Sequence, residues 1–166
     1  MKKNQLRKGL MAATLAAGLM SAPTAFANPP AAGDLALSLN PFFEGSVGAP
    51  SYSLGYFVSD TVMPYAFIGI EGRDVGDDVF TIGGGVRAYL GGMSDRLRPY
   101  AGGAIGIVNA EDTGFGIGAF FGAEAMIVNG FSVSGQVGLD IVDQGCNGCS
   151  ANVDLGVASA QFNFYF

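Results

Sequence analysis

The chain has 166 residues, of which 49% are hydrophobic, only 13% are charged and none is histidine. A soluble domain usually carries about a quarter charged residues, and the absence of histidine argues against Ser-His and Cys-His nucleophiles and most zinc enzymes. The excess of acidic over basic residues argues against nucleic-acid binding, and the apolar content argues against intrinsic disorder.

The first 27 residues have the three parts of a secretory signal peptide. Residues 2–8 are basic, residues 9–20 are apolar, and the small-residue site Ala-Phe-Ala follows at 25–27. The apolar run is too short for a transmembrane helix, which needs about 20 residues. Cleavage after Ala27 is expected to leave residues 28–166 as one domain, with four arginines against 14 acidic residues and a net charge of −10.

The rest of the chain alternates with a period of two residues, which is typical of β-strands. In residues 131–141, for example, the apolar side chains from Phe131 to Ile141 alternate with Ser, Gln, Gly and Asp. Turn signals divide the chain into eight expected strands: 35–44, 51–58, 63–73, 79–90, 98–109, 115–127, 131–142 and 153–166. Most exceed the 5–6 residues typical of soluble sheets and suit tilted membrane strands of about 9–11 residues.

The composition of the two strand faces distinguishes a membrane barrel from a soluble one. One face is continuously aliphatic, and the other holds Gly, Ser, Thr and Gln with a few single charges. Small polar residues suit the crowded interior of a narrow barrel, whereas a surface facing water would carry many Lys and Glu. The sequence therefore predicts an all-β fold, an eight-stranded antiparallel up-and-down transmembrane β-barrel with its aliphatic face in lipid.

Aromatic residues fall near both ends of the expected strands. With the N-terminus on the periplasmic side, the periplasmic group is Tyr56, Tyr65, Tyr89, Tyr100, Phe131 and Phe166. The opposite group is Phe43, Tyr52, Phe80 and Phe115. Strands are rich in aromatic residues in general, but two separate groups are typical of the girdles of a membrane barrel.

The last strand carries Phe162, Phe164 and Phe166 at steps of two residues. It resembles the C-terminal signature that the barrel-assembly machinery reads in Gram-negative outer-membrane proteins. Residues 98–104 (Arg-Pro-Tyr-Ala-Gly-Gly-Ala) and 114–118 (Gly-Phe-Gly-Ile-Gly) resemble the small outer-membrane barrels that include opacity proteins and the OmpA-type membrane domain. The resemblance implies a bacterial outer-membrane location, with membrane lipid, lipopolysaccharide and the assembly machinery as partners. The expected loops are shorter than those of adhesive members, and no peptidoglycan-binding domain is expected after the barrel.

Cys146 and Cys149 lie in the longest expected loop. A Cys-x-x-Cys pair can be a redox site, half of a zinc site or a local disulfide. The chain offers no further Cys or His to complete a zinc site, and the loop has no helix start of the kind that redox pairs use. We therefore predict a disulfide that forms in an oxidising compartment.

Six acidic residues lie in the other expected loops at that end or at the loop edge: Asp74, Asp77, Asp78, Glu111, Asp112 and Asp143. Such a cluster can hold Ca²⁺, but residues 74–78 lack the spacing of a calcium-binding loop. We interpret these residues as solvated loop tips and predict no metal site.

Four charged residues occupy the small, polar face: Glu71, Arg87, Glu124 and Asp140. Carboxylates there could be catalytic, but the outer-membrane enzymes to which the resemblance extends depend on His. We predict that Arg87 and Glu124 form an ion pair that fills the lumen, with Glu71 and Asp140 nearer the outer mouth, because an unpaired interior charge is costly.

The expected function is that of a non-enzymatic outer-membrane barrel without a cofactor, with a structural or surface-interaction role. Any extracellular partner would meet its short acidic loops. The alternative is a narrow channel or carrier for small or apolar solutes, and a soluble periplasmic ligand-binding barrel ranks third.

Overall fold

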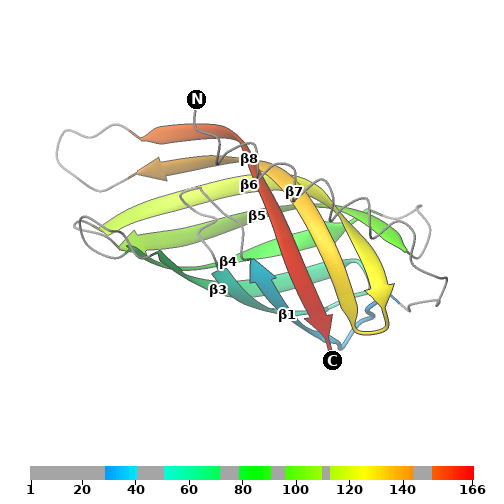
Figure 1. Ribbon diagram of the computed structural model, residues 1–166. Helices are drawn as coiled ribbons and strands as arrows, with labels where there is room; N and C mark the ends of the chain where they lie inside the picture. Colours follow the sequence, from blue (N-terminus) through cyan, green and yellow to red (C-terminus); the bar gives the residue numbers. More distant parts are fainter. Residues whose placement is uncertain (1–28, 41–50, 72–78, 91–95, 110–112, 144–150) are drawn as a thin grey trace, which may run out of the picture.

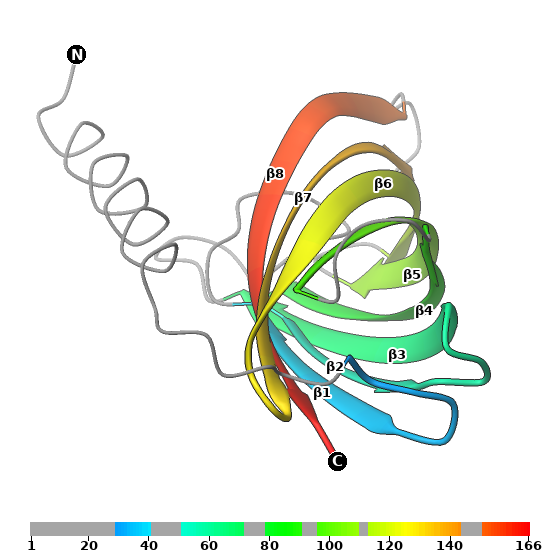
Figure 2. The same cartoon turned by 90° about the vertical axis from the view of Figure 1, so that its right-hand side faces the viewer.

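The alternating stretches of the sequence form eight strands, each paired antiparallel with its neighbours in the sequence. The computed structural model describes residues 29–40, 51–71, 79–90, 96–109, 113–143 and 151–166. The strands are β1 (Leu35–Asn40), β2 (Ser51–Tyr56), β3 (Val62–Glu71), β4 (Val79–Tyr89), β5 (Leu97–Asn109), β6 (Thr113–Val128), β7 (Phe131–Asp143) and β8 (Asn152–Tyr165). β1 also pairs with β8 and closes the barrel (Figure 1 and Figure 2).

This architecture confirms the predicted eight-stranded antiparallel up-and-down barrel. Every predicted strand boundary agrees with the structure to within two residues, apart from the end of β1. The structure ends that strand at Asn40, and residues 41–44 lie outside the described part of the chain. No helix in the described part has the length and apolar character needed to cross a membrane.

The two ends of the barrel differ. We call the end where β1 starts and β8 finishes the terminal end, and the opposite end, which includes Asn40, Asn109 and Asp143, the loop end. β6 and β7 are joined at the terminal end by the short turn Asn129-Gly130, with Gly130 at a φ of 77°. In β8, Gly156 has a φ of 78° and stands opposite no residue of β7, because Leu155 pairs with Leu139 and Val157 with Gly138.

The outer face of the barrel is apolar, whereas the inner face holds the buried polar and charged side chains together with aromatic ones. Large exposed hydrophobic side chains occur around the whole circumference: Leu54, Ile68, Ile82, Val86, Ile105, Ile117, Phe121, Val137 and Ile141. In contrast, Ser132, Glu124 and Asn163 are 0% exposed. This is the reverse of the usual distribution in soluble proteins, where charged residues are almost never fully buried.

The interior is filled by large side chains that lie over glycines of neighbouring strands. A Cβ added to Gly122 of β6 would come within 2.8 Å of the Tyr100 ring on β5. A Cβ on Gly85 would come within 2.6 Å of the Tyr65 hydroxyl on β3. The same relation joins Gly83 with Phe67, Gly102 with Phe120, Gly118 with Asp140 and Gly55 with Met63. The glycines of the polar face thus make room for interior aromatic and charged groups.

The prediction that Tyr65, Tyr89 and Tyr100 belong to an outward-facing aromatic girdle is wrong. Tyr89 and Tyr100 are 5% and 0% exposed, and Tyr65 lines an interior cavity. These tyrosines have the strand parity of the interior face, as the two-residue step from Arg87 to Tyr89 shows, so they cannot face outward. Of the residues predicted for the girdles, those that do lie on the outer face are Tyr56, Phe131 and Phe166 toward the terminal end and Tyr52, Phe80 and Phe115 toward the loop end. Phe43 lies outside the described residues.

Candidate functional site in the barrel interior

Glu124 of β6 is the centre of a hydrogen-bonded network in the terminal half of the barrel. Its side chain is fully buried, and both carboxylate oxygens accept hydrogen bonds from tyrosine hydroxyls. Tyr89 of β4 donates to Oε2 at 2.7 Å, and Tyr165 of β8 donates to Oε1 at 2.7 Å. A buried carboxylate is costly unless it is hydrogen-bonded. The two tyrosine hydroxyls supply these hydrogen bonds and therefore stabilise Glu124.

Arg87 lies beside Glu124, but its shortest contact is with another residue. Its Nη1 is 3.9 Å from Glu124 Oε2, whereas its Nη2 donates a 2.6 Å hydrogen bond to Gln161 Oε1. Nη1 also donates to the Tyr89 hydroxyl at 3.5 Å, and the guanidinium carbon lies 4.3 Å from the centre of the Tyr100 ring. The structure therefore brings the expected partners together, and Tyr89 links them more closely than they contact each other.

Side chains of β7 and β8 extend the network. Asn163 donates to Ser132 Oγ at 3.0 Å and to Ser134 Oγ at 3.2 Å. Ser134 donates to Gln161 Oε1 at 3.5 Å, and the hydroxyls of Ser132 and Tyr165 are 3.3 Å apart. Polar groups from four strands, β4 and β6–β8, are thus joined across the interior.

Aromatic rings and a second arginine pack below this network, toward the terminal end. The Tyr89 ring lies 5.6 Å from Phe57 and 5.7 Å from Tyr100, centre to centre. The guanidinium of Arg98 lies 4.2 Å from the centre of the Tyr89 ring, in cation–π geometry. Arg98 also donates to the backbone carbonyl oxygens of Asp60, at 2.6 Å, and Pro30, at 3.5 Å. The β2–β3 turn and the segment before β1 are thereby held against the barrel end.

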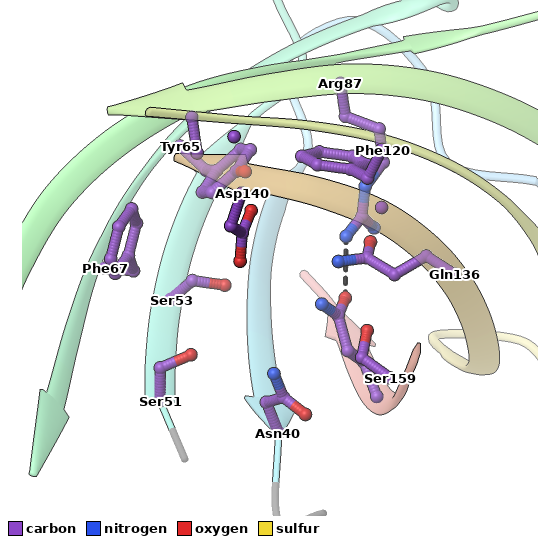
Figure 3. A pocket seen from close by; sticks show the side chains of 14 residues that line it. Asn40, Ser51, Ser53, Tyr65, Phe67, Arg87, Phe120, Gln136, Asp140 and Ser159 are labelled. Carbon is purple, nitrogen blue, oxygen red and sulfur yellow. Dashed lines mark hydrogen bonds between the residues drawn. The ribbon is translucent and has the colours of Figure 1, made fainter. Parts of the chain in front are cut away.

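The loop half of the interior contains a cavity of about 70 Å³ (Figure 3). Asp140 lines this cavity, together with Asn40, Ser53, Tyr65 and Gln136. Arg87 and Gln161 line it as well. The hydrogen bond between Arg87 and Gln161 therefore forms the boundary between the cavity and the filled terminal half.

The remaining predicted site residues fall into two groups. Phe162 and Phe164 lie on the outer face against Phe131, with ring centres 6.3 and 5.1 Å from it, and Phe166 is 76% exposed. Cys146 and Cys149 lie outside the described residues, and Glu71 ends β3 with a side chain that is also outside them. Within the described ranges, no three His, Cys, Asp or Glu side chains come together in a group that could hold a metal ion.

Sequence reasoning missed most of the network, namely Tyr89, Tyr100, Tyr165, Gln161, Ser132, Ser134 and Asn163, and it also missed Arg98 beside it. Their strand parity was the available signal, because Tyr89 is two residues from Arg87, and Gln161 and Tyr165 alternate with the outward Phe162 and Phe164. What the network can do chemically is close the terminal half with side chains that are joined by hydrogen bonds.

The sequence matches no protein-family model and no curated protein. Among solved structures, it is similar to the N-terminal β-barrel domain of Pseudomonas aeruginosa OprF, with a TM-score of 0.57, 15% identity, and coverage of 82% of this chain and 100% of that chain. Two weaker similarities are to Neisserial surface protein A (TM-score 0.48, 20% identity, coverage 80% and 94%) and E. coli outer membrane protein W (TM-score 0.43, 14% identity, coverage 82% and 98%). At this level of identity the OprF match defines the fold. The chain has the fold of the small eight-stranded outer-membrane β-barrels, as the resemblance in its sequence implied.

Proposed function

We propose that the protein is a non-enzymatic β-barrel of a bacterial outer membrane, with a structural or surface-interaction role. The observation that carries the proposal is the inverted distribution of polarity, with exposed aliphatic side chains around the barrel and buried charges inside it. Burial of an aliphatic band in lipid is favourable. Closure of the barrel pairs every backbone N–H and C=O group of the strands, which lipid could not hydrogen-bond.

The direction of the barrel follows from the predicted signal peptide. With the N-terminus in the periplasm, the terminal end faces the periplasm and the loop end faces outward. The acidic residues at the loop end, such as Asp143, then meet lipopolysaccharide or an extracellular partner. The outer face carries the side chains of Phe162, Phe164 and Phe166, which the barrel-assembly machinery can reach there.

Fractionation together with a heat-modifiability gel tests this proposal. Intact barrels resist SDS at room temperature, so the unheated protein should migrate faster than the boiled protein and should be recovered with outer membranes. Recovery in the soluble periplasmic fraction, with identical mobility before and after heating, would contradict the proposal.

A narrow channel or carrier is a second candidate, because the cavity of about 70 Å³ occupies the loop half of the interior. The network around Glu124 favours a closed barrel, since its side chains fill the terminal half. Planar-bilayer recordings distinguish the two functions: a closed barrel gives no steady conductance, whereas a steady open level in the wild-type protein would establish the channel.

A further inference from the structure

Three buried polar atoms on side chains that line the cavity in the loop half have no hydrogen-bond partner among the described residues. They are Asn40 Oδ1, Arg87 Nε and the Ser159 hydroxyl. Asn40 and Arg87 are only 7% and 3% exposed. Buried polar groups in native proteins are almost always hydrogen-bonded, to ordered water where no protein group is available. These three atoms therefore indicate a further hydrogen-bonding partner in the cavity.

The chemistry of the three atoms restricts what this partner can be. Arg87 Nε can only donate a hydrogen bond, Asn40 Oδ1 can only accept one, and the Ser159 hydroxyl can do either. A metal or ammonium cation could not accept from Arg87 Nε, and a simple anion could not donate to Asn40 Oδ1. Water both donates and accepts, and it brings no further charge into the interior. The set of unpartnered atoms therefore favours water over an ion of either sign.

The cavity has the polarity and the room that buried water requires. The side chains of Asn40, Ser53 and Gln136 project into one common space from three different strands (Figure 3). One water molecule needs about 10–15 Å³ of such volume, so the cavity of about 70 Å³ holds about five to seven. A buried water typically makes about three hydrogen bonds, and water molecules in a group of this size can also bond to one another.

The terminal half of the interior is filled by protein groups instead. The Tyr89 ring packs 5.6 Å from the Phe57 ring and 5.7 Å from the Tyr100 ring, centre to centre. Both carboxylate oxygens of Glu124 accept hydrogen bonds at 2.7 Å. Asn163 Oδ1 also lacks a partner there, but Asn163 does not line the cavity in the loop half. That cavity is where several unpartnered atoms share one space.

We propose that a cluster of ordered water molecules occupies the loop half of the barrel interior and hydrogen-bonds to Arg87 Nε, Asn40 Oδ1 and the Ser159 hydroxyl. The water solvates the Arg87 guanidinium, whose protein contacts are Gln161 at 2.6 Å and Glu124 at 3.9 Å, and so lowers the cost of burying this charge. The cluster ends at the hydrogen bond between Arg87 and Gln161, where a water path through the barrel is interrupted. The inference concerns the interior and holds whichever role the barrel has.

Transfer of NMR magnetisation from water protons to alanine methyl groups tests this proposal, with the labelled protein in lipid nanodiscs. Ala104 of β5 lines the cavity, whereas Ala36 of β1 is 1% exposed and packs in the terminal half. Neither side chain has an exchangeable proton, so transfer reports nearby water. We expect transfer to the Ala104 methyl group and none to the Ala36 methyl group. Absence of transfer to Ala104, or equal transfer to both, would overturn the proposal.

Two leucine substitutions on β8 establish whether the water near Ala104 lies in the cavity. Ser159→Leu adds an apolar side chain to the cavity wall, and Ala160→Leu adds the same side chain on the opposite, outer face of the strand. Transfer to Ala104 should fall at least threefold in Ser159→Leu and change less than twofold in Ala160→Leu. Unchanged transfer in a folded, heat-modifiable Ser159→Leu variant would contradict the proposal. The comparison of Ala104 with Ala36 needs no substitution, so it remains decisive if Ser159→Leu does not fold.

A titration with sodium chloride distinguishes water from a bound ion. Transfer to the Ala104 methyl group should be the same at low and high salt, because the salt hardly changes the activity of water. A saturable loss of transfer as sodium chloride is added would show that an ion takes the place of the water cluster, and would overturn the proposal.

Discussion

At the scale of single residues, the central group is the Glu124 carboxylate, which is held by two tyrosine hydroxyls and one arginine. The strand parity of Arg87 and Glu124 was readable from the sequence and placed both inside the barrel. Their actual separation was not readable, because it depends on the stagger of the strands. In the register, Arg87 stands opposite Gly102, whereas Glu124 stands opposite Arg98, four residues away on β5. The two side chains reach toward each other across the interior, so that Arg87 Nη1 lies 3.9 Å from Glu124 Oε2 despite this offset.

Removal of the Tyr89 hydroxyl tests the geometry of this group. Tyr89→Phe leaves Glu124 Oε2 without its 2.7 Å donor and should lower the free energy of unfolding by about 1–3 kcal/mol. Urea unfolding of the protein in lipid vesicles measures the change. The control is Tyr52→Phe, which alters a 61% exposed tyrosine and should stay within about 0.5 kcal/mol of the wild type. Equal effects of the two substitutions would show that the hydroxyl does not stabilise Glu124.

A double-mutant cycle tests the coupling between Arg87 and Glu124. Removing one partner of a buried charge pair typically costs about 3–5 kcal/mol, so Arg87→Ala and Glu124→Ala should each destabilise the barrel strongly. The double variant should lose less stability than the sum of the two single variants, because neither charge is then left alone. Simple additivity in the same urea-unfolding measurement would mean that the two groups do not interact.

At the scale of the strands, close packing depends on glycines that face large interior side chains. Strand number, order and boundaries were predictable, because turn residues and the two-residue alternation reflect local geometry. The interior position of Tyr65, Tyr89 and Tyr100 was mispredicted, because position along the strand was weighted above parity. Parity decides which way a side chain points, whereas position along the strand decides only its depth.

The glycine positions allow a matched comparison on two neighbouring strands. Gly122→Ala adds a Cβ within 2.8 Å of the Tyr100 ring and should destabilise the barrel by about 1–3 kcal/mol through overpacking. Gly135→Ala adds a Cβ on the exposed face of β7, where the nearest atom is the Ser159 carbonyl oxygen at 3.7 Å, and should be neutral or slightly stabilising. Urea unfolding of both variants provides the comparison. Similar losses would show that the interior glycines are not required for packing.

At the scale of the whole molecule, the barrel displays apolar side chains outward and holds a polar, filled terminal half inside. The fold was predictable because composition, alternation and strand length all favoured the same architecture. The cavity in the loop half was not predictable, since it depends on how side chains from all eight strands share one space.

The assembly of the barrel in the outer membrane tests the role of Phe166. Phe166→Ala should lower the yield of heat-modifiable protein in the outer membrane, because the exposed terminal ring is part of the proposed assembly signal. Phe115→Ala is the control, since it removes a 51% exposed ring from the outer face of β6 and should leave the yield unchanged. A full yield of assembled Phe166→Ala protein would show that the assembly machinery does not need the Phe166 ring.

The absence of tryptophan from the chain allows a direct test of whether the apolar outer face contacts lipid. Phe120 and Phe121 are adjacent on β6, yet Phe121 is 53% exposed on the outer face and Phe120 packs inside, 6.2 Å from the Tyr100 ring. A single tryptophan is introduced by Phe121→Trp or by Phe120→Trp, and each variant is reconstituted in lipid with brominated acyl chains. We expect strong quenching of tryptophan fluorescence in Phe121→Trp and weak quenching in Phe120→Trp. Equal quenching, or stronger quenching in Phe120→Trp, would contradict a barrel whose apolar face contacts lipid.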